Sequence, residues 1–287
     1  MSEVSELSEV SELEESRSPI SKGSDSDSGS VNDSDDDSEN DSDEDLVNNS
    51  VEDSEEDSVD DSVEDSVEDS DDDSEKSKLE LEISSYELDI AGGDKPVTVL
   101  QDASGNAGCG VGATVWDAGL VLAKYLEWQT INGSLDLSNK TVLELGAGTG
   151  IVGLALAKVQ PKCNVILTDK AELIPLLQRN IELNGALNAK VQCLDWNTDS
   201  TDFEPDVILV SDGIFASDLH QPLADVLHRV AGAKTRVLLA YESRVFSDEV
   251  NFFALWSQHF TFHDIKLADQ HPVTRSEDIF VFEGRRK

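Results

Sequence analysis

The stretch Glu144-Leu145-Gly146-Ala147-Gly148-Thr149-Gly150 decides the fold. It joins an apolar run at 141–145, which predicts a strand, to a run at 151–159 that predicts a helix. Glycines at such a strand-to-helix turn let the backbone turn tightly and approach a bound nucleotide closely. The G-x-G-x-G spacing, with Glu144 two positions before the first glycine, departs from the dinucleotide fingerprint. An acidic residue beside exposed backbone suits a cationic nucleoside that bears an amino acid.

Outward from this motif, strands and helices alternate along the chain. The apolar strands are continuous, as in a sheet that is covered on both faces. The β-α-β-α order predicts a parallel, doubly wound α/β sheet. Two final strands without a helix between them predict an added antiparallel hairpin. Strands are expected at 141–145, 164–168, 190–194, 206–210, 236–241, 260–267 and 279–283, and helices at 151–159, 170–184, 219–231 and 249–259.

Upstream of the motif, we expect a small β/α lead-in. Apolar and polar residues alternate over 79–90, the glycines and aspartate at 92–94 predict a turn, and further alternation follows at 97–99. This pattern indicates a hairpin. From 115 to 126 the apolar spacing becomes helical, and a polar loop follows at 132–139.

Residues 1–78 are a low-complexity run of serine, aspartate and glutamate. Residues 1–80 hold 33 acidic and 4 basic residues, whereas the remainder of the chain holds 28 and 17. Such a segment cannot bury enough apolar surface to offset the entropy of ordering. We therefore expect a disordered acidic tail at 1–78 and one folded domain at 79–287. A solubilising role is the simpler interpretation of the tail, and a docking arm for basic partners is the alternative.

The net charge of −40 excludes several classes of function. It argues against nucleic-acid binding through phosphates and against anionic membrane surfaces, and it favours basic protein partners. No apolar run of about 18 residues and no signal peptide are found. The three cysteines form no CxxC pair, so a reducing compartment, the cytosol or nucleus, is expected for the protein. Cys163 and Cys193 lie in apolar runs, so we expect their thiols to be buried. The histidines lack metal-ligand spacing, so no metal site is expected.

Asp169 ends the strand that follows the glycine-rich turn. An acidic residue at this position binds the ribose hydroxyls of an adenosine cofactor. Capping of the helix at 170–184 is the alternative role. Because the glycine-rich turn precedes it, we favour ribose binding.

Five segments carry a resemblance to a known family. They are 110–119 (GVGATVWDAG), 144–157 (ELGAGTGIVGLALA), 176–184 (LLQRNIELN), 206–215 (DVILVSDGIF) and 241–244 (YESR). From about residue 79 to the end, the chain resembles the seven-β-strand protein-lysine methyltransferases of the methyltransferase-like 21 group. The resemblance implies a Rossmann-like, seven-stranded class I methyltransferase sheet with S-adenosylmethionine as cofactor.

The resemblance also implies which residues meet the cofactor. Trp116 would contact it from the lead-in helix, and Trp196 would flank the adenine. Their flat rings suit an adenine or a sulfonium, and core packing is the alternative for each. Together with Glu144 from the spacing argument, the expected cofactor-binding set is Trp116, Glu144, Gly146, Ala147, Gly148, Asp169, Trp196 and Ser211.

The D-x-x-Y signature of the family reads Asp212-Gly213-Ile214-Phe215 here, with phenylalanine in place of tyrosine. We expect Asp212 to accept a hydrogen bond from the substrate amine, while Phe215 keeps a π face for an ammonium but lacks the hydroxyl. Glu242 is a second candidate acceptor, and Arg244 is expected to hold Asp212 or Glu242. An ion-pair network at the strand ends, without a catalytic role, is the alternative.

These expectations favour a monomeric protein-lysine N-methyltransferase whose substrate is a protein with a basic surface. The nearest resemblance implies a valosin-containing AAA ATPase as substrate. Related enzymes of the group imply translation elongation factor 1A and chaperones. Two alternatives stay open: a catalytically weak S-adenosylmethionine-binding protein that holds basic partners, and a methyltransferase of small amines. Nucleobase methylation is disfavoured, because the fourth strand does not end in a clamp for a flipped base.

Overall fold

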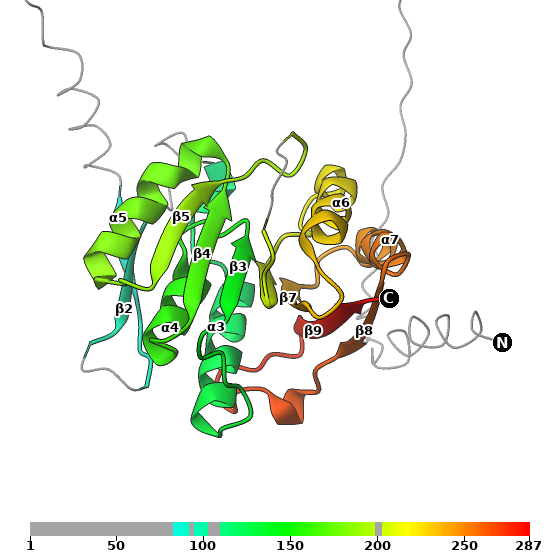
Figure 1. The fold of residues 1–287 in the computed structure, drawn as a ribbon. Coiled ribbons are helices and arrows are strands. Elements are labelled where there is room, and N and C mark those ends of the chain that lie inside the picture. Colours follow the sequence, from blue (N-terminus) through cyan, green and yellow to red (C-terminus); the bar gives the residue numbers. More distant parts are fainter. Residues whose placement is uncertain (1–82, 92–94, 103–109, 199–202) are drawn as a thin grey trace, which may run out of the picture. The chain divides into compact units, whose positions relative to one another are not determined.

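The computed structural model describes residues 83–91, 95–102, 110–198 and 203–287 (Figure 1). The predicted acidic tail at 1–78, the predicted turn at 92–94 and Cys109 lie outside the described residues. Within the described part of the chain, no helix is both long and apolar enough to cross a membrane.

Seven strands form the main sheet: β3 (Thr141–Leu145), β4 (Asn164–Asp169), β5 (Ala189–Cys193), β6 (Val207–Ser211), β7 (Arg236–Glu242), β8 (Phe260–Asp264) and β9 (Ile279–Arg286). Their order is β5-β4-β3-β6-β7-β9-β8 (Figure 1). The strands from β5 to β7 pair in parallel, and β9 is antiparallel to both of its neighbours. This topology confirms the predicted Rossmann-like, seven-stranded sheet.

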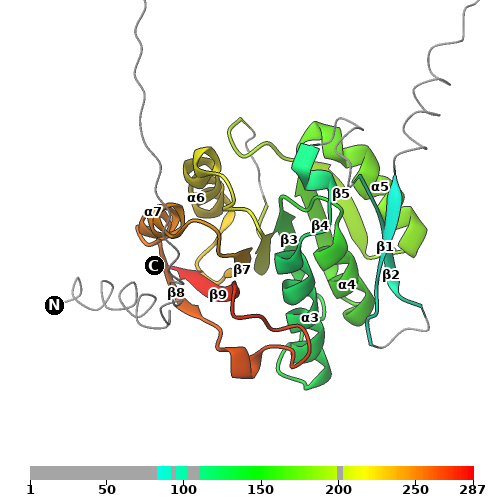
Figure 2. The same cartoon turned by 180° about the vertical axis from the view of Figure 1, so that it is seen from behind.

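Helices cover both faces of this sheet. They are α3 (Asp117–Ile131), α4 (Ile151–Val159), α5 (Ile174–Asn184), α6 (His220–Val230) and α7 (Phe246–Trp256). Neighbouring residues of a strand point to opposite faces. Val281 of β9 belongs to the core that α3 and α4 share with the sheet, whereas the ring of Phe282 packs against Phe253 of α7 with centroids 4.8 Å apart. Hence α3 and α4 cover one face and α7 covers the other (Figure 2).

The predicted β lead-in is confirmed by β1 (Ser84–Leu88) and β2 (Val97–Gln101), which pair antiparallel. The side-chain amide of Asn180 in α5 binds the backbone of β2. Its Oδ1 accepts a hydrogen bond from the Leu100 N–H at 2.7 Å, and its Nδ2 donates to the Leu100 carbonyl at 3.0 Å and to the Thr149 carbonyl at 2.8 Å. This fully buried amide therefore ties the lead-in to the glycine-rich turn.

Several element ends differ from the predictions. Helix α3 begins two residues later than predicted and continues to Ile131. Glu127, in the added part, is buried with its carboxylate bound to the Ala91 N–H and to Lys124. The predicted helix at 170–184 becomes α-helical only at Ile174, just before a proline in its first turn. Helix α7 begins at Phe246, three residues before the predicted start.

The end of the chain confirms one prediction, and one cysteine corrects another. Strands β8 and β9 form the predicted antiparallel pair, which is added to the sheet beyond β7 with β9 next to β7 and β8 at the edge. The alternation of exposed residues in β8 suits an edge, whereas β9 is largely buried. Cys163 is buried as predicted, but Cys193 is exposed because β5 is the other edge strand of the sheet.

Candidate active site

A cavity of about 490 Å³ opens at the carboxyl ends of the parallel strands. This edge is where open α/β sheets bind ligands, and the volume falls in the usual range of small-molecule sites, roughly 300–1,000 Å³. Most residues predicted for the site line the cavity: Trp116, Gly146, Ala147, Gly148, Asp169, Trp196, Ser211, Asp212, Phe215 and Arg244. Two predicted residues, Glu144 and Glu242, do not line it.

The glycine-rich turn needs its glycines for close contacts as well as for backbone shape. Gly146 and Gly148 have φ angles of 67° and 56°, in the left-handed region that favours glycine. A Cβ on Gly148 would lie 2.4 Å from the Gly112 carbonyl oxygen of the lead-in, and one on Gly146 would lie 3.0 Å from the ring of Trp196. The turn therefore touches the lead-in on one side and a cavity tryptophan on the other.

Asp169 fastens this turn from the neighbouring strand. Its Oδ2 accepts a hydrogen bond from the Gly148 N–H at 2.8 Å, and its Oδ1 accepts one from the Lys170 N–H at 2.8 Å. Burial raises the pKa of the Asp169 carboxyl, and these two hydrogen bonds offset part of that rise. Each carboxylate oxygen can accept a second hydrogen bond. Asp169 therefore shapes the turn and still has acceptor capacity facing the cavity.

Glu144 takes a different place from the one predicted. Its side chain is fully buried, and its Oε2 accepts a hydrogen bond from the Gly153 N–H in α4 at 2.9 Å. Its Oε1 has no hydrogen-bond partner among the residues that the structure describes. Burial raises the pKa of this carboxyl to about 8. Glu144 therefore joins β3 to the first turn of α4 and does not line the cavity.

Two tryptophans line the cavity from different segments. Trp116 precedes α3, is 42% exposed, and donates from Nε1 to the Val111 carbonyl at 3.0 Å. Its exposure excludes the core-packing alternative. Trp196 follows β5, and Arg229 donates to its main-chain carbonyl at 3.0 Å. Its ring lies against Gly146, so it belongs to the wall of the cavity next to the glycine-rich turn.

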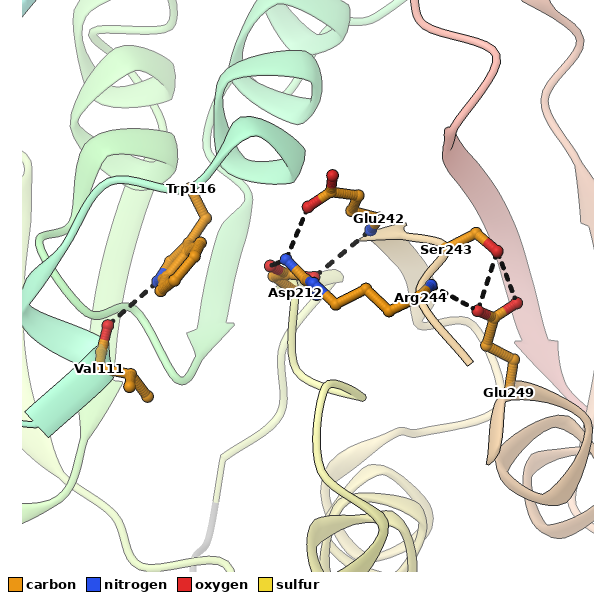
Figure 3. A network of polar contacts seen from close by, with 7 residues as sticks. All are labelled: Val111, Trp116, Asp212, Glu242, Ser243, Arg244 and Glu249. Carbon is orange, nitrogen blue, oxygen red and sulfur yellow. Dashed lines mark hydrogen bonds and ion pairs between the residues drawn. The ribbon is translucent and has the colours of Figure 1, made fainter. Parts of the chain in front are cut away.

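Asp212 lies directly after β6 in a conformation unusual for its residue type. Its φ is 54°, and backbone strain of this kind costs on the order of 1 kcal/mol. The Asp212 N–H donates to the Ala240 carbonyl at 2.8 Å, which holds the backbone against β7. Arg244 binds the carboxylate in a two-pronged ion pair, with Nη1–Oδ1 at 2.8 Å and Nη2–Oδ2 at 2.7 Å (Figure 3). The side chain of Asp212 is thus fixed at the cavity.

Glu242 lies beside this pair. Nη2 of Arg244 also contacts Glu242 Oε2 at 2.7 Å, and the Glu242 N–H donates to Asp212 Oδ1 at 3.3 Å. The prediction that Arg244 holds Asp212 or Glu242 is confirmed, and the guanidinium holds both. The hydrogen bond to Asp212 is the main cause that raises the pKa of Arg244, which therefore stays charged. Because Glu242 does not line the cavity, Asp212 is the better-placed acceptor.

Phe215 is 51% exposed and lines the cavity a few residues after β6. It supplies an apolar ring without a hydroxyl, as the sequence analysis expected. Other lining residues were not predicted. Their signal in the sequence is only their proximity to the motifs, and they include Val111, Thr114, Leu173, Asn197 and Leu219.

The lining fits an adenosine-type methyl donor. It combines a glycine-rich turn, an acidic residue at the end of the next strand and two aromatic rings in one cavity. Together with the sheet topology, this arrangement defines a class I methyltransferase. The sequence matches the model of a family described as lysine methyltransferase over residues 94–259. The chain therefore belongs to the lysine methyltransferase family and is an enzyme of that class.

Named relatives agree with this assignment. EEF1A lysine methyltransferase 3 of Xenopus tropicalis is 33% identical over 185 residues, which cover 63% of this chain and 77% of the relative. Protein N-lysine methyltransferase METTL21A of Mus musculus is 30% identical over 185 residues, with 62% and 79% covered. Protein-lysine N-methyltransferase EFM6 of Saccharomyces cerevisiae is 30% identical over 234 residues, with 71% and 92% covered. These relatives support the predicted resemblance to the methyltransferase-like 21 group.

Proposed function

We propose that this enzyme methylates a lysine ε-amine of a protein substrate that presents a basic surface. S-adenosylmethionine is its methyl donor. The observation that carries the proposal is the shared cavity: the glycine-rich turn with Asp169 lines one part of it, and Asp212 with Phe215 lines another. A donor and an acceptor amine can therefore meet at the same edge of the sheet.

The reaction needs a neutral amine in line with an electrophilic methyl group, in a site from which water is largely excluded. Gly146, Gly148 and Asp169 would hold the cofactor, which would supply an electrophilic sulfonium methyl group to the amine nitrogen. Asp212 orients the amine by accepting a hydrogen bond. The face of Phe215 stabilises the positive charge that develops on nitrogen.

The substrate proposal rests on charge and on resemblance. Beyond residue 80 the chain still holds 28 acidic residues against 17 basic ones, which favours a basic partner surface. Elongation factor 1A is our first candidate, because one relative is named for it. A valosin-containing AAA ATPase and chaperones are the others. We further propose that the enzyme acts as a monomer in the cytosol or nucleus.

The test incubates the full-length protein with S-adenosylmethionine labelled in the methyl group and each purified candidate in turn. One candidate should become labelled on lysine, and at low cofactor concentration Asp169→Ala should reduce the label about tenfold or more. Label on small amines alone would support the small-amine alternative. No label despite measured cofactor binding would leave the catalytically weak binding protein as the better account and contradict the proposal.

A further inference from the structure

Arg244 connects three segments of the site through one guanidinium (Figure 3). It pairs with Asp212 after β6 and with Glu242 at the end of β7, and its Cζ lies 5.7 Å from the ring centroid of Trp116 in the lead-in. Resting on the proposed function, we propose that Arg244 is a positioning residue for methyl transfer. It fixes the Asp212 carboxylate as the acceptor and ties it to the wall of the cofactor cavity.

The first argument is charge balance. The carboxylates of Asp212 and Glu242 are neighbours, because both contact Nη2 of Arg244 at 2.7 Å, and two carboxylates this close repel each other in a partly buried place. Arg244 compensates one of the two charges and leaves the group with a net charge of −1. That charge matches one incoming lysyl ammonium. A second free carboxylate charge would hold the ammonium form too strongly for it to become a nucleophile.

The second argument is orientation. A two-pronged contact between guanidinium and carboxylate fixes the plane of the carboxylate, which a lysine in place of Arg244 could not do. Because the Asp212 backbone already has a left-handed conformation and a hydrogen bond to Ala240, its side chain has little freedom left. Because Oδ1 accepts two of these hydrogen bonds and Oδ2 accepts one, one acceptor position on Oδ2 is left for the substrate and has a fixed direction.

The third argument is that the backbone of Arg244 is bound by a buried carboxylate of α7. The carboxylate of Glu249 in α7 is buried and accepts a hydrogen bond from the Arg244 N–H at 2.9 Å (Figure 3). The same carboxylate accepts from Ser243 Oγ at 2.9 Å. Helix α7 thus anchors the loop that carries the guanidinium, which is the arrangement expected of a residue whose position matters.

The fourth argument is the contact with the lead-in. A guanidinium within about 6 Å of an indole centroid gives a cation–π attraction. Trp116 is also held by its hydrogen bond to Val111, so Arg244 links the carboxylate pair to a cavity wall. Removal of Arg244 should therefore affect cofactor binding as well as methyl transfer, with the larger effect on transfer.

The test compares Arg244→Ala and Arg244→Lys in the full-length protein with a matched control, Arg285→Ala. Arg285 pairs with Glu283 at 3.0 Å, is more exposed and lies outside the cavity lining. Three quantities are measured: kcat with elongation factor 1A over a range of pH, the Kd of S-adenosylhomocysteine by calorimetry, and recovery of kcat on addition of guanidinium chloride at low concentration.

Arg244→Ala should lower kcat about 10- to 100-fold through misplacement of the acceptor. It should weaken S-adenosylhomocysteine binding by only about two- to fivefold, through the lost cation–π contact. The acid side of its pH profile should move to higher pH, because the uncompensated second carboxylate charge holds the substrate amine in its ammonium form. Added guanidinium should restore part of kcat in Arg244→Ala. Arg244→Lys should be intermediate, and Arg285→Ala should behave like the wild type.

Unchanged kcat and unchanged cofactor affinity in a folded Arg244→Ala would overturn the inference. A loss without recovery by guanidinium and without a change of pH profile would also overturn it, since that pattern means a structural role only. If the wild type labels no candidate but binds S-adenosylhomocysteine, it is the proposed function that fails. The calorimetric comparison of Arg244→Ala with the wild type then decides the contact with Trp116 separately.

Discussion

The carboxylate of Asp169 and the backbone of Gly148 are joined by a hydrogen bond of 2.8 Å that spans two neighbouring strands. The residue predicted to bind the cofactor ribose therefore also holds the glycine-rich turn in place. Cofactor affinity and the shape of the turn are coupled through this one side chain, and mutations at either residue should affect both.

Asp169→Ala should weaken S-adenosylmethionine binding by about tenfold or more, since it removes a charged acceptor from the cavity. It should also lower the free energy of unfolding by about 1–3 kcal/mol, because the buried Gly148 N–H loses its partner. Asp169→Asn can still accept one N–H and should recover most of the stability without recovering the affinity. Calorimetric titration and chemical denaturation of the same samples measure both. If Asp169→Asn lost as much stability as Asp169→Ala, or kept the affinity of the wild type, the two proposed roles of Asp169 would not be separable in this way.

The pH dependence of cofactor binding should follow the same carboxyl. Burial raises the pKa of Asp169, and ribose hydroxyls are bound best by the ionised form. Affinity should therefore fall on acidification, and the fall should begin at a higher pH than for an exposed aspartate, whose pKa is about 4. Calorimetry over a range of pH, with Asp169→Asn as the reference, measures the effect. If the affinity of the wild type changed as little with pH as that of the variant, Asp169 would not be the source of a pH dependence of binding.

Gly148→Ala should disturb the turn through collision rather than through backbone strain alone. The added Cβ would meet the Gly112 carbonyl oxygen at 2.4 Å, and φ is 56°. Gly185→Ala is the matched control, because its φ is 58° and nothing lies within 4 Å of an added Cβ. The control should cost on the order of 1 kcal/mol of stability, while Gly148→Ala costs more and also weakens cofactor binding. Similar unfolding free energies for both variants would argue against the collision.

The sequence predicted the sheet and most of the cavity because both depend on local patterns. Continuous apolar strands alternating with helices define a parallel sheet, and residues at the carboxyl ends of such strands must meet at one edge. Asp169 was placed at the cavity by this rule together with the glycine-rich turn, whereas Ser211 and Asp212 were placed there by the family resemblance. Glu144 was assigned from the spacing of the glycine-rich motif, which does not say which way a side chain turns; its carboxylate binds Gly153 in α4 and does not line the cavity.

Contacts between distant segments could not be predicted in this way. Asn180 lies in a helix pattern, and nothing local indicates that its amide pairs with Leu100 and Thr149. The position of β9 between β7 and β8 likewise depends on tertiary packing. In the sequence, burial of a strand on both faces appears only as an apolar run, which does not say which strands are its neighbours. The contact of Arg244 with Trp116 joins residues that lie far apart in the sequence, so it could be found only in the folded chain.

Glu144→Gln should remove a pH dependence of stability. The folded pKa of Glu144 is about 8, above its ordinary value of 4.5, so the folded state binds this proton more tightly than the unfolded state. Stability from this group is fully present below about pH 4.5 and is lost as the pH rises through about 8, by an amount on the order of a few kcal/mol. Chemical denaturation at several pH values should show a shallower slope for Glu144→Gln. Parallel curves for the two proteins would mean that Glu144 is ionised in the fold.

Phe215 offers the sharpest test of whether the altered D-x-x-Y signature is a working site. The ring is half exposed and lines the cavity, so Phe215→Ala should change the free energy of unfolding by less than about 0.5 kcal/mol. It should nevertheless lower kcat/KM by about tenfold, because the developing positive charge loses its π face. Phe215→Tyr keeps that face and should stay within about threefold of the wild type. If the wild type is almost inactive and Phe215→Tyr restores transfer, the hydroxyl is what the chemistry needs. The natural chain would then be a cofactor-binding protein with a decayed acceptor site, and the lysine-methylating role proposed for it would have to be abandoned.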